Sequence, residues 1–321
     1  MRRIARLGAA AFAGIALAAP ALADPPACRL LQAASLQMST EPDGQIAVPV
    51  AIDDRPARLV VDTGSIYSSM SSALVSEFDL KPKPAARIYE LLGNVPLYDI
   101  VFPHSFRIGN LSTDDIGFYV APSRALHADS AGLLGPDIMS KYDVEFDFAH
   151  ARFNIFSQDH CPGQVVYWTR DPYAQVAIRV DDNWHISVPV TLDGKPIVAL
   201  LDTGSARSSM SLDVAKSVMG IDESNPALKT LEPVSINGTA RVAMYHYPFQ
   251  TLTLDGVEVR NPLIDILPAA MFGKGAPQLI LGLSALRQLH FYIAYKEQML
   301  YATAAEAAPV DAAAPPAANP P

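Results

Sequence analysis

The stretch RLVVDTGS at residues 58–65 returns in the same pattern as VALLDTGS at residues 198–205. In both copies an apolar run leads into Asp-Thr-Gly-Ser, which predicts a buried strand that ends in a tight loop. Each loop carries one aspartate, Asp62 in the first copy and Asp202 in the second, 140 residues further along the chain. The sequence therefore places two carboxylates in matching local settings.

The repeat extends to both sides of this motif at the same spacing. The tripeptide VPV at 48–50 returns at 188–190, and SSMS at 68–71 returns at 208–211. Shared spacing on both flanks indicates an internal duplication of a whole unit rather than a recurring short turn.

Each unit follows the same order of predicted elements: two strands into the aspartate, a short helix, a hairpin, further strands and two closing strands. We place the first unit at 45–160, a connector at 161–175 and the second unit at 176–303. A segment at 24–44 precedes them. Residues 304–321 are almost only alanine and proline, so they are expected to form a disordered tail.

The first residues of the chain have the order of a secretory signal. Three arginines within the first six residues precede an apolar stretch at 7–22, and Ala-Leu-Ala at 21–23 offers a small-residue cleavage site. The apolar stretch is shorter than the roughly 20 residues that span a bilayer, which disfavours the alternative of an uncleaved anchor. We expect residues 1–23 to be a cleaved signal peptide and the protein to be periplasmic or secreted.

Composition limits the classes of partner. The formal net charge is −9, and removal of the signal peptide takes away three arginines and no acid, which makes it −12. An acidic chain without a basic run is a poor candidate for binding nucleic acid or an anionic membrane. The seven histidines show no metal-binding spacing, so we expect no metal and no cofactor.

The two cysteines, Cys28 and Cys161, stand at the entrance of the first unit and just past its end. In an oxidising compartment a disulfide between them is favoured over two free thiols. A Cys-His nucleophile that uses His160 is disfavoured, because adjacent residues on an extended chain point to opposite sides.

Two further elements carry a resemblance to a known family. LLG at 133–135 and ILG at 280–282 each place a glycine before a short helix, and DVEFD at 143–147 has the form of a closing strand. With the paired motifs, the chain resembles the retropepsin/pepsin superfamily of aspartic proteases from about Gln45 to Thr303. The resemblance implies an all-β, bilobal acid-protease fold, with short helices and two retropepsin-like β-barrel lobes related by a pseudo-twofold axis.

In such a fold Asp62 and Asp202 would lie side by side as the catalytic pair. Two carboxylates that close share one proton and can activate a water against a peptide bond. The resemblance thus implies an exported aspartic-type endopeptidase, a hydrolase that acts on protein or peptide substrates. It would work as a monomer without stable membrane insertion. The alternatives are a peptide-binding protein that uses the same cleft without catalysis, and a dimer that exchanges lobes.

Six neighbours are expected to support the pair: Thr63, Gly64, Ser65, Thr203, Gly204 and Ser205. The glycines would let the backbone approach the carboxylates without a side chain in the way. The serine hydroxyls would hydrogen-bond the outer carboxylate oxygens. The threonines, by resemblance, would cross-link the two loops beneath the site.

Two hairpins, at about 88–102 and 234–247, would act as flaps that exclude water and pair with an extended peptide. Three tyrosines on them, Tyr89, Tyr98 and Tyr245, are candidates for flap contacts. Each could instead be an ordinary half-buried strand residue.

Overall fold

The computed structural model describes residues 29–306 except for five short segments, at 92–94, 124–125, 127–129, 237–239 and 273–276. The predicted signal peptide and Cys28 lie outside the described residues, as does the chain beyond residue 306. Almost all regular structure in the described part is β-strand, so the prediction of an all-β fold with short helices is confirmed.

The first lobe is a sheet of ten strands. They are β2 (Ser39–Thr40), β3 (Ile46–Ile52), β4 (Arg55–Val61), β5 (Ser69–Ser71), β6 (Lys83–Leu91), β7 (Val95–Val101), β8 (Phe106–Ile108), β9 (Leu111–Thr113), β10 (Phe118–Ala121) and β11 (Gly132–Leu134). Their spatial order is β6-β7-β10-β5-β11-β4-β3-β8-β9, and β2 pairs with β3.

The second lobe is also a ten-stranded sheet. Its strands are β15 (Arg179–Val180), β16 (Ile186–Leu192), β17 (Lys195–Leu201), β18 (Ser208–Ser211), β19 (Lys229–Ile236), β20 (Ala240–His246), β21 (Thr251–Leu254), β22 (Val257–Arg260), β23 (Ile264–Leu267) and β24 (Leu279–Leu281). Their order, β19-β20-β23-β18-β24-β17-β16-β21-β22 with β15 beside β16, repeats that of the first lobe strand for strand.

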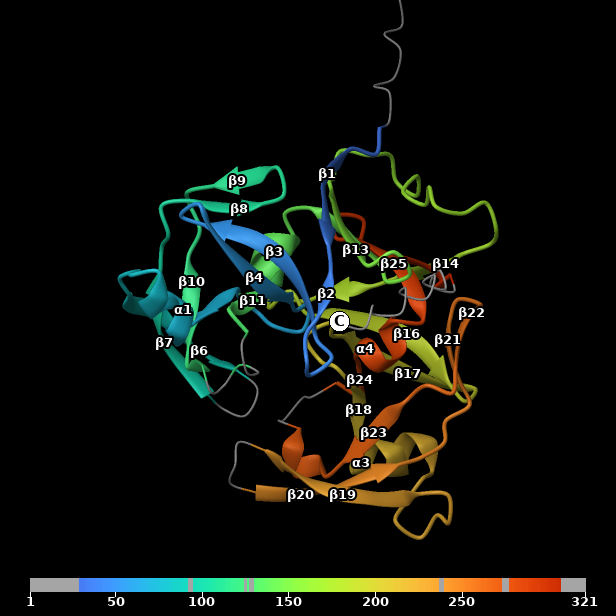
Figure 1. Cartoon of the computed structure of the whole chain (residues 1–321). Helices are drawn as coiled ribbons and strands as arrows, with labels where there is room; N and C mark the ends of the chain where they lie inside the picture. Colours follow the sequence, from blue (N-terminus) through green and yellow to red (C-terminus); the bar gives the residue numbers. More distant parts are fainter. Residues whose placement is uncertain are drawn as a thin grey trace, which may run out of the picture.

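This correspondence confirms the two related lobes (Figure 1). One part of the prediction is wrong: in the part of the chain that the structure describes, each lobe is an open path of strands and no closed barrel forms. Each strand order has a long hairpin at one end and a short hairpin at the other. These two ends do not pair with each other.

A third sheet of six strands joins the lobes. It consists of β1 (Gln32–Gln37), β13 (Arg152–Phe156), β12 (Asp143–Asp147), β25 (Leu289–Ala294), β26 (Met299–Ala304) and β14 (Ala174–Ala177), in that order. The predicted closing strands are therefore present, but they pair across the lobes, because β12 runs antiparallel to β25 with Phe146 opposite Phe291. This shared sheet fixes one lobe against the other.

The helices are short: α1 (Ser72–Glu77), α2 (Pro136–Met139), α3 (Leu212–Val214), the π-helical turn η2 (Ala215–Met219), the 3-10 turn η3 (Ala269–Met271) and α4 (Leu283–Leu286). The repeated SSMS motif explains where two of them begin. Ser71 caps α1 by accepting a hydrogen bond from the Leu74 N–H at 3.1 Å, and Ser211 caps α3 through the Val214 N–H at 3.1 Å.

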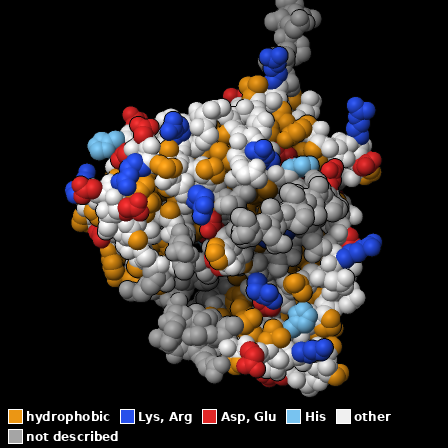
Figure 2. All heavy atoms as spheres, in the orientation of Figure 1, with side chains coloured by type: hydrophobic (Ala, Val, Ile, Leu, Met, Phe, Trp, Pro, Cys, Tyr) orange, Lys and Arg blue, Asp and Glu red, His pale blue; other side chains and the backbone are white. Residues whose placement is uncertain are grey.

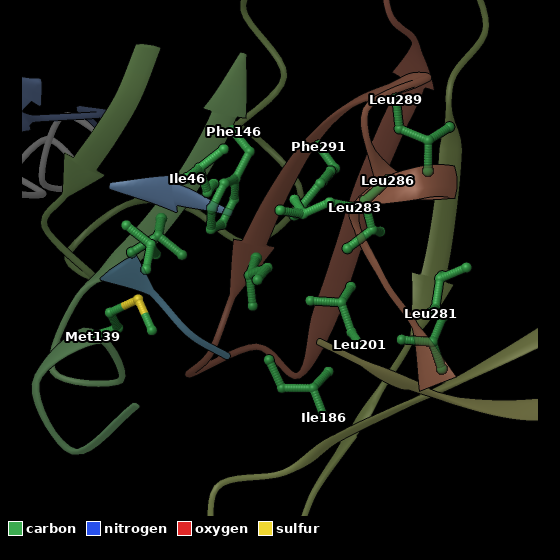
Figure 3. Packing of buried hydrophobic residues seen from close by; sticks show 14 of the residues in the cluster. Ile46, Met139, Phe146, Ile186, Leu201, Leu281, Leu283, Leu286, Leu289 and Phe291 are labelled. Carbon is green, nitrogen blue, oxygen red and sulfur yellow. The ribbon is translucent and has the colours of Figure 1, made fainter. Parts of the chain in front are cut away.

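The core consists mainly of aliphatic and aromatic side chains, which stand at alternate positions of the strands and point inward (Figure 3). At its centre Phe146 and Phe291 stack with ring centroids 4.7 Å apart. Ile46 and Ile186 come from matching positions at the starts of β3 and β16, and both are buried. One continuous core thus runs through both lobes and the shared sheet.

The predicted tail begins later than residue 304. Ala304 ends strand β26, and the Ala305 N–H donates a hydrogen bond to the Gln288 carbonyl at 2.7 Å. Among the described residues, no helix has the length and apolar character needed to cross a membrane. On the face shown in Figure 2, acidic and basic side chains are interspersed and do not gather into a field of one sign.

Candidate active site

Strands β4 and β17 end directly before Asp62 and Asp202. The Asp62 N–H donates to the Leu134 carbonyl at 3.0 Å, and the Asp202 N–H donates to the Leu281 carbonyl at 3.0 Å. These bonds prolong the parallel pairing of β4 with β11 and of β17 with β24. The LLG and ILG elements therefore hold each aspartate at the end of its strand.

The two aspartate loops, one from each lobe, face each other across the lobe boundary. A Cβ atom placed on Gly64 would overlap the Asp202 carboxylate, and one placed on Gly204 would overlap the Asp62 carboxylate. Only glycine leaves room for this approach. The structure thus brings the two predicted carboxylates to one site, each against the loop that carries the other.

Beneath the carboxylates, Thr63 and Thr203 cross-link the loops with four reciprocal hydrogen bonds. Each threonine N–H donates to the other threonine's Oγ1, at 3.1 and 3.0 Å. Each hydroxyl in turn donates to a carbonyl of the opposite strand, Leu201 for Thr63 and Val61 for Thr203, both at 2.8 Å. Both threonines are fully buried, so the expected cross-link is present and satisfied.

The inner oxygen of each carboxylate is held by the backbone of its own loop. The N–H groups of Gly64 and Ser65 donate to Asp62 Oδ1 at 2.9 Å each. The second loop repeats this arrangement on Asp202 Oδ1, at 3.0 and 3.1 Å. Two backbone donors per carboxylate hold its inner oxygen, and a side-chain hydrogen bond joins the two carboxyl groups.

The expected role of the serine hydroxyls is wrong. The Ser65 hydroxyl donates to the backbone carbonyl of Asp62 at 3.0 Å, and the Ser205 hydroxyl donates to the carbonyl of Arg207 at 2.8 Å. Both hydroxyls thus hydrogen-bond backbone carbonyls and not a carboxylate. The serines shape the loops and leave the outer carboxylate oxygens to other partners.

Burial raises the pKa of both carboxyl groups. The pKa of Asp202 rises to about 8, because of burial first and the negative charge of Asp62 second. Burial also raises the pKa of Asp62, while the N–H groups of Gly64 and Ser65 act in the opposite direction. The pair is enclosed by both loops yet retains some exposure to solvent, as a pair that works on water requires. Two such groups hold one proton between them over a broad pH range.

A comparison with protein families agrees with this geometry. The aspartyl protease family model matches residues 48–138 and again 188–285. This chain belongs to the aspartyl protease family. Each match runs from the VPV strand to the short helix after the glycine, so the two matches coincide with the two lobes. No curated protein matches the chain.

In this protease family member, only one of the three flap tyrosines reaches a residue of the aspartate loops. The Tyr89 hydroxyl on β6 donates to the Tyr67 hydroxyl at 2.8 Å, with ring centroids 4.2 Å apart. Tyr98 has 58% of its surface exposed, and Tyr245 donates to Glu223 at 3.3 Å. Hairpin β6–β7 is thus connected to the residues that follow Asp62.

Tyr67 and its counterpart in the second lobe, Arg207, were missed in the sequence. Tyr67 packs on Tyr119 at 5.4 Å between centroids, whereas Arg207 Nη2 donates to Asp265 at 2.7 Å. Tyr119 and Asp265 occupy the same register on β10 and β23. A residue-by-residue comparison of the two repeats would have revealed both pairs, since each differs where the surroundings agree.

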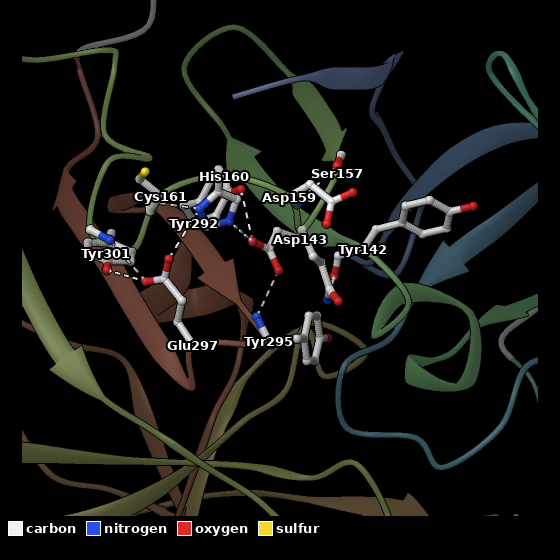
Figure 4. A network of polar contacts seen from close by, with 12 residues as sticks. Tyr142, Asp143, Ser157, Asp159, His160, Cys161, Tyr292, Tyr295, Glu297 and Tyr301 are labelled. Atoms are coloured by element: carbon white, nitrogen blue, oxygen red, sulfur yellow. Dashed lines mark hydrogen bonds and ion pairs between the residues drawn. The ribbon is translucent and has the colours of Figure 1, made fainter. Parts of the chain in front are cut away.

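A second group of buried ionisable residues lies on the shared sheet and the connector (Figure 4). His160 Nε2 lies 2.6 Å from Asp143 Oδ2, and its Nδ1 lies 3.2 Å from Glu297 Oε1. Tyr292 donates to Asp143 at 3.2 Å, and Tyr301 donates to Glu297 at 2.8 Å. His160 therefore bridges two carboxylates from the two halves of the sheet.

The remaining predicted site residue, Cys161, starts the connector directly after His160. Its predicted partner, Cys28, precedes the described residues. The disulfide between them stays a prediction.

Proposed function

We propose that the chain is an exported aspartic endopeptidase that hydrolyses peptide bonds with a water activated between Asp62 and Asp202. The observation that carries this proposal is the reciprocal placement of the two aspartate loops, each glycine lying against the other lobe's carboxylate. Membership of the aspartyl protease family gives independent support at the level of the family.

The chemistry follows from one shared proton. The ionised carboxylate accepts a proton from the bound water, while the protonated partner donates a hydrogen bond to the scissile carbonyl oxygen. The water oxygen bonds to the carbonyl carbon as the C=O π bond opens, and the carbonyl oxygen takes the proton of the protonated partner, which gives a neutral tetrahedral diol. The carboxyl that took the water proton then passes it to the nitrogen, and the carbon–nitrogen bond breaks. The other carboxylate takes a proton back from a diol hydroxyl, which releases an amine and a carboxylic acid and restores the pair.

Cleavage of a mixed peptide library between about pH 3 and 7 tests this function, with Asp62→Asn and Asp202→Asn measured beside the native protein. Each variant should lose about 10²–10⁴-fold in turnover, because neither carboxyl can act as both acid and base alone. Asp54→Asn is a matched control, since Asp54 has a side chain that is 89% exposed.

Retained turnover in either dyad variant would contradict the shared site. Peptide binding without cleavage by the native protein would favour the alternative of a non-catalytic peptide-binding protein. In size-exclusion chromatography the protein is expected to elute as a monomer, because both aspartates belong to one chain.

Export is the other part of the proposal. It is supported by the basic, apolar and small-residue order of residues 1–23. N-terminal sequencing of the protein from cell fractions should find Asp24 as the first residue, in the periplasm or the medium. A cytoplasmic protein that keeps Met1 would contradict export.

A further inference from the structure

The loop of Asp202 is packed against a turn from the first lobe. In the first lobe this turn precedes β3, and Gln45 at its end is only 5% exposed. The Gln45 side-chain amide donates to the carbonyl of Gly204, next to Asp202 in the opposite loop. A Cβ atom on Gly44 would lie 3.6 Å from the Ala206 Cβ. The first-lobe turn thus closes over the loop of Asp202.

The second lobe builds the same turn, with His185 in the place of Gln45. The Glu41 N–H donates to the Gln45 carbonyl at 2.8 Å, and the Asp181 N–H donates to the His185 carbonyl at 3.1 Å. His185 immediately precedes β16, just as Gln45 immediately precedes β3. The pseudo-twofold relation therefore directs His185 toward the loop of Asp62.

The electrostatics of the pair agree with this placement. A positive charge at His185 acts to lower the pKa of Asp62, against the larger effect of burial. Gln45, on the other side, has no charge to offer Asp202. The two carboxyl groups have matching backbone contacts but different cations near their turns. One turn carries the titratable His185, whereas on the other side Arg287 Nη2 donates to the Gly44 carbonyl at 2.8 Å.

The charged groups around His185 are few. Asp181, on the same turn, has its Oδ2 3.6 Å from His185 Nδ1. Asp62 is the other acidic group whose charge interacts with that of His185. Arg287 is the C-cap residue of helix α4, whereas the C-cap residue of the equivalent helix α2 is Ser140, so α2 brings no second cation to the turn of His185.

We propose that His185 is a positioning residue that makes the pair asymmetric: its imidazolium stabilises ionised Asp62, which acts as the base, and Asp202 keeps the shared proton. This inference rests on the proposed peptidase function for its kinetic consequences. The histidine touches neither substrate nor water in this role and acts only through Asp62.

The test compares His185→Gln, which reproduces the side chain found at Gln45, with His185→Lys, which keeps a positive charge. In the glutamine variant the midpoint of the acid limb of the pH–kcat/KM profile should move to a pH that is higher by about 0.5 to 1, because ionised Asp62 loses a nearby cation. The lysine variant should restore the native limb.

His104→Gln is the matched control, since the His104 side chain is 97% exposed. Its profile should equal that of the native protein. An acid limb that stays in place in His185→Gln would overturn the proposal, as would a lysine variant that behaves like glutamine.

A titration that needs no turnover separates this inference from the proposed function. Carboxyl carbon NMR of ¹³C-aspartate-labelled protein, assigned with Asp62→Asn and Asp202→Asn, reports which aspartate ionises first. Asp62 should ionise first in the native protein, at a higher pH in His185→Gln. The inference fails if Asp202 ionises first. It also fails if the order and the titration midpoints of the two aspartates are the same in His185→Gln as in the native protein, whether or not peptides are cleaved.

Discussion

At the scale of single residues, the site depends on the absence of side chains at Gly64 and Gly204. Each glycine lies where a Cβ atom would overlap the carboxylate of the other lobe. The glycine after each Asp-Thr could be predicted to admit the backbone, because the motif is short and local. Its contact with the opposite aspartate could not, since that contact joins residues far apart in the chain.

Gly64→Ala should therefore disable the pair. The added methyl group must displace the Asp202 carboxylate, and a displacement of about 1 Å at a reacting group costs on the order of 10²-fold in rate. Overpacking should also lower the free energy of unfolding by about 1–3 kcal/mol. Peptide cleavage and urea unfolding measure the two effects.

Gly256→Ala is the control, because a Cβ atom there meets nothing within 4 Å. Its φ of +88°, which Gly64 does not share, strains an alanine. It should lose some stability and keep its activity. Full activity in Gly64→Ala would show that the two loops are further apart than the structure has them.

The serine hydroxyls show a limit of prediction at this scale. A serine after Asp-Thr-Gly has three staggered positions for its hydroxyl, and several acceptors lie within reach. Ser65 and Ser205 choose different carbonyls, Asp62 and Arg207. The identical motif does not determine the bond, because the rest of each loop differs.

At the scale of elements, the two hairpins have the same predicted role as flaps but make different contacts. Hairpin β6–β7 connects to the loop of Asp62 through Tyr89 and Tyr67. In the second lobe the position of Tyr67 is taken by Arg207, which pairs with Asp265 instead. The strands, the turns and the hairpins follow from local patterns, whereas the choice of a tyrosine pair or an ion pair depends on which strands become neighbours.

Tyr89→Phe should weaken substrate capture while it leaves the fold intact. The change removes one side-chain hydrogen bond, worth about 0.5–1.5 kcal/mol, which corresponds to a loss in kcat/KM of roughly two- to tenfold. Tyr98→Phe removes the same atom from the same hairpin, where the residue is 58% exposed, and should behave as the native protein. Equal kinetics for both variants would contradict a role for the tyrosine pair in closing the hairpin.

At the scale of the whole molecule, the shared six-stranded sheet joins the two lobes. His160, directly before the connector, contacts Asp143 on this sheet. Burial disfavours the charge on His160, but the carboxylates of Asp143 and Glu297 raise its pKa above the usual range. Burial raises the pKa of Asp143 as well. Because a carboxylate faces each ring nitrogen, we assign the charge to the imidazolium.

The pH dependence of unfolding tests this assignment. A histidine whose pKa is raised by folding stabilises fully below its unfolded value of about 6.5, and the contribution is lost as the pH rises through the folded value. The free energy of unfolding in urea should therefore fall above about pH 6.5. His160→Gln should flatten this slope, while His104→Gln should keep it. A slope that persists in His160→Gln would contradict the assignment.

The sequence by itself determined the duplication, the two aspartates with their threonines and glycines, and the succession of predicted strands, turns and short helices along each unit. These features follow from hydrophobic periodicity and turn chemistry, which act between near neighbours in the chain. The spacing of the repeat was enough to match the lobes, and the family resemblance supplied their arrangement.

Only the tertiary structure decided how the halves meet. It paired β12 with β25 across the lobes, put His160 between two carboxylates and set Gln45 against the loop of Asp202. Such contacts join residues up to about 160 positions apart. Their partners depend on packing and burial in the folded chain, which periodicity and spacing do not specify.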